Sequence, residues 1–353
     1  ENHVAGLLRN IVSLQPMKSL SFETLKSLLK SPKNVVIVSH INPDGDAIGS
    51  SLGLYHYLIQ KGHLATIVVP NDYPDFLKWL PGKTEVLNFE FDSAVVQNVF
   101  DNADLVFTLD FNALHRCGNL KSVLEANTAP KIMIDHHQYP EAYAAYTYSD
   151  SDMGSTAEMI YHFMTQLGDL ELLNKDIGTA LYTGIMTDTA SFRFPKTTAT
   201  THRVVAHLIE VGIAHSEIHS LVYDANRFER IQLVGIALSN LRVLKPFNAV
   251  YISLSQDELD ACNYQKGDTE GLVNYGLSVK GVKLAAIFIE NSVDEIIKIS
   301  LRSKGAIDVN QIARDHFNGG GHVNAAGGKS NLSLEATIDL FKALVINLNS
   351  DLK

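Results

Sequence analysis

The sequence has little cysteine, no long apolar run and no excess of positive charge. Only two of its 353 residues are cysteines, Cys117 and Cys262, and they form no CxxC pair. This excludes a disulfide framework and favours a reducing cytoplasm as the location. No apolar stretch reaches the roughly 18 residues of a membrane-spanning helix, and the first residues are too polar for a secretory signal. Because the chain begins with Glu rather than Met, we expect a trimmed or cut native start.

The charge balance is acidic, with 29 Lys and Arg against 39 Asp and Glu and a net charge of −10. A protein that coats long nucleic acid needs a basic face, so we expect no long duplex nucleic acid as a partner. The lack of a long apolar run makes a membrane an unexpected partner too. A site for one small phosphate compound remains compatible with this charge. At about 150 residues per domain the length predicts two domains. The hydrophobic content of 46% and the charged content of 19% fit a globular interior and argue against a disordered chain.

Short apolar runs alternate with helical patterns in the first half of the chain. After a helical leader over about the first 30 residues, β-branched and apolar runs predict strands, and periodic apolar residues predict helices. This alternation favours a mostly parallel sheet with helices on both faces. The strands are expected at 35–38, 65–69, 105–109 and 131–134, and the helices at 47–61, 155–167 and 175–186.

The pattern changes near residue 198, where helices follow one another without a strand between them. These helices, expected at 202–211, 217–223 and 228–241, indicate a helical linker. A second, smaller α/β domain follows. Its strands are expected at 250–254, 283–289 and 295–301, and its helices at 268–278, 309–317 and 334–347.

Polar residues stand at the ends of several predicted strands and after one helix. The loop after the first strand contains His40, Asp44 and Asp46, and Asp110 closes the third strand. Each of these segments alone is also compatible with a polar turn or a helix cap. Functional loops of an open α/β sheet lie at the carboxyl ends of its strands, so we expect the side chains to converge. The remaining members of the set are Asp135, His136 and His137 after the fourth strand, and Asp188 after the helix at 175–186.

Four aspartates and two histidines on one sheet edge predict a metal centre. Clustered carboxylates without a counter-charge repel one another and have raised pKa values, and two divalent cations would cancel that charge. Oxygen and imidazole donors without a thiolate suit Mn²⁺ better than structural Zn²⁺, and Mg²⁺ is a further candidate. A cation pair about 3.5–4 Å apart is the usual device for in-line displacement at phosphorus.

Two sets of motifs carry a resemblance to a known family. The triplet Asp135-His136-His137 and the segment HINPDGDAIGS at 40–50 resemble motifs of the DHH phosphoesterase superfamily. The segment GGGHVNAAGG at 319–328, with Ser300-Leu301-Arg302-Ser303 before it, resembles the signature of the DHHA1 domain. The chain therefore resembles the DHH/DHHA1 members of the nano-RNase (oligoribonuclease) and pAp-phosphatase type.

The resemblance implies an architecture. It implies an N-terminal parallel-sheet DHH domain, a smaller C-terminal α/β DHHA1 domain and an active site in the cleft between them. We place the catalytic domain with its leader at 1–197, the linker at 198–241 and the substrate-binding domain at 242–353.

The resemblance also implies roles for the residues of the first domain. One cation would be held by His40, Asp44 and Asp110, and Asp110 would bridge to the second cation. His137 would contact the scissile phosphate or protonate the leaving group. The other implied members are Asp46, His136 and Asp188 as ligands of the second cation, Asp135 as an orienting residue, and Arg116 as a phosphate contact near the reacting atoms.

The glycine-rich segment of the second domain predicts a phosphate or nucleotide site. Consecutive glycines expose backbone N–H groups to an anion and permit close approach of a nucleotide. Arg302 can hold a phosphate through two hydrogen bonds. The full set of predicted substrate contacts is Arg302, Ser303, Gly319, Gly320, Gly321, His322 and Asn324.

These features together predict a phosphodiesterase with two Mn²⁺ ions per chain. Its predicted substrates are short single-stranded oligoribonucleotides, cut to nucleoside monophosphates, and pAp, dephosphorylated to AMP. One alternative is a hydrolase of cyclic dinucleotides or of pApA. Others are an inorganic pyrophosphatase, which the glycine-rich segment disfavours, and a nucleotide-sensing module, which the complete ligand set disfavours. The preferred length, the direction of attack and the oligomeric state stay open.

Overall fold

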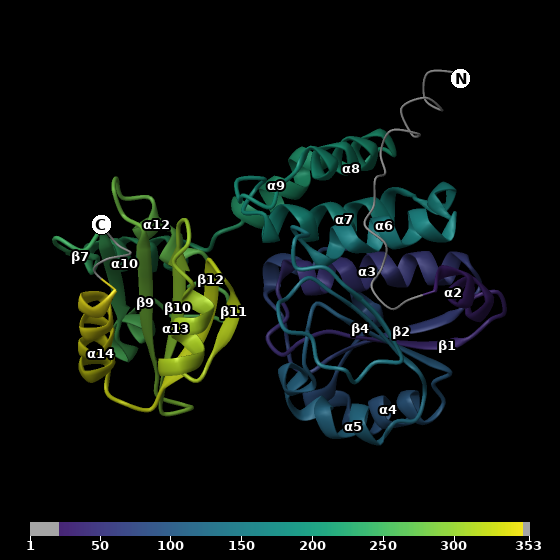
Figure 1. Ribbon diagram of the computed structural model, residues 1–353, viewed down its shortest axis with the longest axis horizontal. Coiled ribbons are helices and arrows are strands. Elements are labelled where there is room, and N and C mark those ends of the chain that lie inside the picture. The colour runs from purple at the N-terminus through teal and green to yellow at the C-terminus, as the bar shows by residue number, and fades with distance from the viewer. Residues whose placement is uncertain (1–20, 349–353) are drawn as a thin grey trace. The chain divides into compact units, whose positions relative to one another are not determined.

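The computed structural model describes residues 21–348 and divides the chain into two compact units (Figure 1). The first unit ends at Ala225 and the second begins at Asn226. This division falls inside the predicted linker, and the boundaries 1–197, 198–241 and 242–353 stay a prediction. Most of the predicted helical leader lies outside the described residues. Within 21–348, no helix is long and apolar enough to cross a membrane.

The first unit contains a six-stranded sheet in the order β3-β2-β1-β4-β5-β6, and every neighbouring pair is parallel. The parallel sheet predicted from the sequence is confirmed. Its two edge strands were not predicted, because these short segments, VLN and YTYS, contain polar residues and form no continuous apolar run. The strands are β1 (Asn34–Val38), β2 (Leu64–Val69), β3 (Val86–Asn88), β4 (Leu105–Leu109), β5 (Lys131–Asp135) and β6 (Tyr146–Ser149).

Helices cover both faces of this sheet, with α3, α6 and α7 on one side and α4 and α5 on the other (Figure 1). Successive residues of β1 therefore enter different cores. Val35 and Ile37 pack with the residues of α3, α6 and α7, whereas Val36 and Val38 pack with those of α4 and α5. The helices are α2 (Phe22–Leu28), α3 (Gly45–Gln60), α4 (Phe89–Asp101), α5 (Lys121–Ala126), α6 (Thr156–Leu167), α7 (Lys175–Asp188), α8 (Ala199–Glu210) and α9 (His215–Tyr223), with short 3-10 turns η1 (Asp75–Leu77), η2 (Lys83–Glu85), η3 (Leu114–Leu120) and η4 (Leu170–Leu172).

The second unit contains a mixed six-stranded sheet in the order β11-β12-β10-β9-β8-β7. Only β8 and β9 are parallel, and the other neighbouring pairs are antiparallel. The predicted second α/β domain is confirmed, and its glycine-rich segment contributes the strands β11 and β12. The strands are β7 (Arg242–Leu244), β8 (Ala249–Leu254), β9 (Leu284–Asn291), β10 (Ile296–Ser303), β11 (Gly320–His322) and β12 (Ala325–Ser330).

Two apolar cores lie on opposite faces of this second sheet. One is formed with α10, α11 and α12, and the other with α13 and α14. The helix predicted at 268–278 is shorter, because Gly271 adopts a left-handed φ of 78° just before the helix begins. The helices of this unit are α10 (Phe228–Ser239), α11 (Gln256–Ala261), α12 (Leu272–Leu277), α13 (Val309–His316) and α14 (Leu334–Asn347).

Candidate active site

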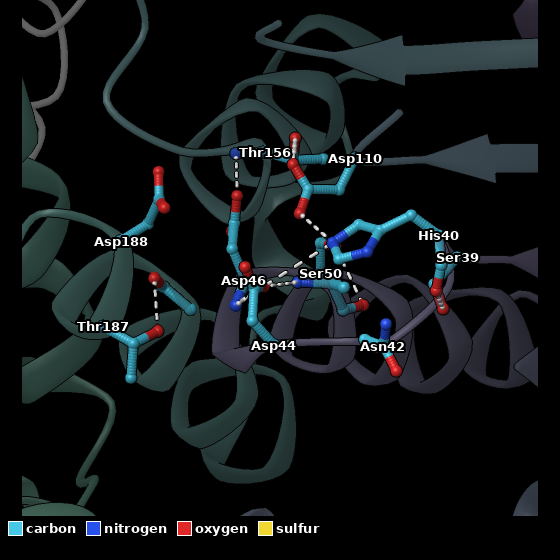
Figure 2. Close-up of polar contacts among 12 residues, drawn as sticks. Ser39, His40, Asn42, Asp44, Asp46, Ser50, Asp110, Thr156, Thr187 and Asp188 are labelled. Atoms are coloured by element: carbon cyan, nitrogen blue, oxygen red, sulfur yellow. Dashed lines mark hydrogen bonds and ion pairs between the residues drawn. The ribbon is translucent and has the colours of Figure 1, made fainter. Parts of the chain in front are cut away.

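Three neighbouring strands of the first sheet end at one edge, and each brings polar residues there. His136 follows β5, His40 follows β1 and Asp110 follows β4. Figure 2 shows His40 and Asp110. Asp110 has a positive φ of 63°, which is uncommon for a residue other than glycine. Such a conformation persists only where the surroundings enforce it, and strained backbone of this kind is frequent at functional sites.

A first cluster consists of His40, Asp44 and Asp110. The Nε2 atom of His40 lies 3.4 Å from Oδ2 of Asp110 and 3.9 Å from Oδ1 of Asp44. Asp44 is also the N-cap of α3, because its Oδ1 accepts hydrogen bonds from the backbone N–H groups of Asp46 and Ala47. Asp44 thus caps the helix and also lies in the cluster, and its predicted role as a metal ligand stays a prediction.

A second cluster consists of Asp46, His136 and Asp188, and Asp110 belongs to it too. The Nε2 atom of His136 lies 3.7 Å from Oδ2 of Asp46, 3.4 Å from Oδ2 of Asp188 and 3.4 Å from Oδ1 of Asp110. Asp110 therefore directs one carboxylate oxygen to each cluster. The structure brings together all six residues that the sequence predicts as metal ligands.

The backbone fixes which nitrogen of each histidine faces its cluster. Nδ1 of His40 lies 2.8 Å from the carbonyl oxygen of Ile41, and Nδ1 of His136 lies 3.2 Å from that of Met153. A carbonyl can only accept, so each Nδ1 carries the proton and Nε2 is the atom available for a cation. Nε2 of His40 is buried and has no hydrogen-bond partner within residues 21–348. These donors fit a pair of divalent cations.

The electrostatics of the clusters agree with this fit. Burial raises the pKa of Asp46 well above its usual range, and repulsion by Asp110 and Asp188 adds to the rise. Burial also raises the pKa of Asp188 to about 7, against the attraction of His136. Burial would lower the pKa of His136, but Asp188 and Asp110 outweigh it and raise that pKa to about 10. The clusters thus hold more negative charge than they can keep without protons or cations.

Close helix packing sets the distance between Asp46 and Asp188, which belong to α3 and α7. Gly49 of α3 lies against Gly184 of α7, and a Cβ atom on Gly49 would come within 2.8 Å of the Gly184 backbone nitrogen. A Cβ atom on Gly184 would lie 2.6 Å from Cβ of Ala157 and 3.1 Å from Oδ1 of Asp46. Only glycine permits this approach of the two helices.

His137, Asp135 and Arg116 form a group beside the clusters. Nδ1 of His137 donates to Oδ1 of Asp135 over 2.7 Å and lies 3.7 Å from Oδ1 of Asp110. Burial, followed by the charge of Arg116, lowers the pKa of His137 well below its usual range. Burial raises the pKa of the carboxyl group of Asp135 to about 6. The roles predicted for these three residues stay predictions.

Thr156 and Met153 contact the clusters and were not singled out from the sequence. Thr156 begins α6, donates its backbone N–H to Asp46 and its hydroxyl to Asp110. Met153 supplies only a carbonyl oxygen, which no sequence pattern reveals. The helix at 155–167 was predicted, but a helix start next to a serine and a threonine is usually no more than a cap.

In the second unit, the strand register brings two predicted substrate contacts together. Arg302 of β10 pairs with Ala325 of β12, and Ala325 pairs with His322 of β11. Residues directly opposite one another on neighbouring strands point to the same face, so Arg302 and His322 share one face of the sheet. The side chains of Ser303 and Asn324 form hydrogen bonds within the adjoining turn. The Ser303 hydroxyl donates to the carbonyl of Ile307 over 2.6 Å and accepts from the Asn324 amide over 2.9 Å.

The glycines at 319–321 were expected to expose backbone N–H groups, and the structure gives two of them another role. The N–H groups of Gly319 and Gly321 donate to the carbonyl of Ala313 and to Oδ1 of Asn310, so the expectation that they are exposed to an anion is wrong. Gly319 and Gly321 are required by close strand packing, because a Cβ atom on Gly319 would lie 1.9 Å from the carbonyl oxygen of Gly327. A Cβ atom on Gly321 would lie 2.5 Å from the carbonyl oxygen of Ala325, and its φ is 152°. Contact of this segment with a substrate stays a prediction.

The first unit is an α/β structure with a parallel sheet. Its two clusters of carboxylates and histidines share one carboxylate, and this is the donor set of a dinuclear metal protein. Residues 34–185 match the DHH family, N-terminal domain, and residues 252–348 match the DHHA1 domain. The chain belongs to the DHH family and carries its DHHA1 domain, as the motifs predicted.

The chain is similar to several named proteins over most of its length. It is 33% identical to the bifunctional oligoribonuclease and PAP phosphatase NrnA of Thermus thermophilus, over 83% of this chain and 83% of that protein. It is 29% identical to the probable enzyme of that name from Streptococcus mutans, over 92% of this chain and 98% of that protein. The crystal structure of an exopolyphosphatase-related protein from Bacteroides fragilis shares 37% identity and a TM-score of 0.89, over 94% of this chain and 97% of that one.

Proposed function

We propose that the chain is a metal-dependent phosphodiesterase that hydrolyses short oligoribonucleotides to nucleoside monophosphates and also converts pAp to AMP. The observation that carries the proposal is the carboxylate of Asp110, which directs one oxygen to each of two donor clusters. The names of the similar proteins from Thermus thermophilus and Streptococcus mutans support the substrate class. A cytoplasmic location is part of the proposal, because both cysteines are buried free thiols.

The proposed cation pair is Mn²⁺, with Mg²⁺ as the alternative, because the donors are carboxylate oxygens and imidazole nitrogens only. When bound, the cations supply Lewis-acid stabilisation of the charge that develops on the phosphoryl oxygens. His40, Asp44 and Asp110 would hold one cation. The other would be held by Asp46, Asp110, His136 and Asp188.

The residues around the clusters would position the substrate. Asp135 accepts a hydrogen bond from Nδ1 of His137 and thereby orients the ring. His137 would contact the phosphate or the leaving group. Arg116 would add a positive charge for a phosphate oxygen. In the second unit, Arg302 and His322 share a sheet face that would hold a terminal phosphate or nucleotide.

A substrate panel tests this proposal. The full-length chain is stripped with a chelator, divided between Mn²⁺, Mg²⁺ and no metal, and given a ribodinucleotide, pAp, a cyclic dinucleotide, pyrophosphate and long single-stranded DNA. We expect metal-dependent release of nucleoside monophosphates from the ribodinucleotide and of AMP from pAp. Preferential cleavage of the cyclic dinucleotide or of pyrophosphate, or equal turnover in chelator, would refute the proposal.

A further inference from the structure

We infer that Thr156 is a positioning residue that sets the orientation of the shared carboxylate of Asp110 relative to Asp46. This inference rests on the proposed function, because it takes both aspartates as ligands of a cation pair. One residue makes both contacts: the backbone N–H of Thr156 lies 2.6 Å from Oδ2 of Asp46, and its hydroxyl lies 3.0 Å from Oδ1 of Asp110. Figure 2 shows Thr156 between these two side chains.

The start of α6 holds Asp46 through its backbone. The N–H groups of Thr156 and Ala157 donate to the two oxygens of the Asp46 carboxylate, over 2.6 and 2.8 Å. The positive end of the helix dipole favours the carboxylate at this place. A side-chain substitution at position 156 leaves these backbone donors in place. Loss of the Thr156 hydroxyl therefore removes the contact with Asp110 and spares the hold on Asp46.

The hydroxyl of Thr156 acts on the oxygen of Asp110 that faces the second cluster. That Oδ1 atom lies 3.4 Å from Nε2 of His136, whereas Oδ2 lies 3.4 Å from Nε2 of His40. A hydrogen bond to Oδ1 opposes rotation of the carboxylate about its own axis. Without this hydrogen bond, the Asp110 carboxylate would lose one of the contacts that hold its orientation. We expect the second cluster to be affected first, because Oδ1 of Asp110 is the oxygen that faces it.

A role in helix capping does not account for Thr156. The N-cap of α6 is Ser155, whose side chain accepts from the N–H of Glu158. Thr156 is completely buried, and its hydroxyl is directed at a carboxylate rather than at a helix carbonyl. Thr183 of α7 offers a matched comparison, because it is also completely buried but donates its hydroxyl to the backbone carbonyl of Thr179.

The test compares Thr156→Val, Thr156→Ser and Thr183→Val in the full chain. Valine has the shape of threonine without its hydroxyl, and serine restores the hydroxyl. Binding of Mn²⁺ is measured by calorimetry, and the magnetic coupling of a bound pair by electron paramagnetic resonance. Outer hydrogen-bond partners of metal ligands are typically worth about 10- to 100-fold in metal affinity. We expect a loss of this size, with loss of the coupled-pair spectrum, in Thr156→Val.

Thr156→Ser and Thr183→Val should keep the native affinity and the coupled spectrum. Native metal binding and coupling in Thr156→Val would overturn the inference, and so would equal losses in Thr183→Val, which would indicate a general packing effect. Should the valine variant not fold, Thr156→Ala makes the same comparison. A wild-type chain that binds a coupled pair but cleaves no substrate refutes only the proposed function. A wild-type chain that binds no pair refutes both.

Discussion

Replacement of Gly184 by alanine tests whether helix packing holds the candidate metal centre together. In an open helix position, Gly→Ala stabilises a protein by about 0.5–1 kcal/mol. At position 184 the new Cβ would lie 2.6 Å from Cβ of Ala157 and 3.1 Å from Oδ1 of Asp46. Overpacking of this kind costs about 1–3 kcal/mol. The two effects oppose each other, and we expect the packing cost to prevail by about 1–2 kcal/mol.

The expected loss is measurable by calorimetry of the full chain. For a unit of this size, 1 kcal/mol corresponds to about 2–4 °C in Tm, so Gly184→Ala should lower the Tm of the first unit by about 2–8 °C. The backbone N–H of Ala157 holds Asp46, so the displaced α6 should also weaken Mn²⁺ binding. Gly235→Ala is the control, because a Cβ atom on that glycine of α10 would meet no atom within 4 Å. The control should raise the Tm of the second unit.

The outcome that would refute this reasoning is a higher Tm in Gly184→Ala with metal affinity unchanged. Helix propensity alone would then decide the effect of a substitution at position 184. The close approach of α3, α6 and α7 would not determine the placement of the Asp46 carboxylate. A lower Tm in Gly235→Ala would instead show that replacing glycine by alanine at an open helix position does not stabilise this protein.

Four further outcomes are expected. Chelation should abolish turnover of a ribodinucleotide, and Mn²⁺ should restore it; full turnover in chelator would contradict a metal centre. Asp110→Ala should lower metal content and rate more than His40→Ala, because Asp110 faces both clusters; equal losses would remove the support for a bridging role. His137→Ala should cut the rate while metal content stays native, and lost metal would make His137 a ligand. A bidentate arginine–phosphate contact is worth roughly 1.5–3 kcal/mol. Arg302→Ala should therefore lower kcat/KM for a ribodinucleotide by about one to two orders of magnitude but spare bis(p-nitrophenyl) phosphate; equal losses would place Arg302 in the chemical step or in folding.

The sequence was informative where a residue's role follows from its position on a strand. Runs such as Val35–Val38 predict buried strands, and an acid or histidine directly after such a run must lie at the carboxyl edge of a parallel sheet. That rule, together with the motifs, was enough to predict six ligand candidates from four separate segments. Three of these segments follow strands that end at the same edge of one sheet, which is why their convergence could be predicted. Asp188 instead ends the helix α7, and the structure places it in the same cluster as Asp46 and His136.

The sequence was misleading where a residue's role depends on what packs against it. Gly319–Gly321 suggested open N–H groups, but whether an N–H group is free depends on its neighbours in the fold. Gly319 and Gly321 donate theirs to Ala313 and Asn310, which both lie in α13. Short edge strands such as Gly320–His322 are likewise formed by pairing with a neighbour, and not by local propensity.

The sequence by itself determined the donor types, their order along the chain and the sheet that carries them, because these follow from local runs and from the geometry of parallel strands. The tertiary structure alone decided that Asp110 directs one oxygen to each cluster, that Thr156 contacts two carboxylates, and that Gly184 must be a glycine. Each of these depends on atoms that are distant in the chain and brought within about 4 Å by packing, and no local pattern records such distances.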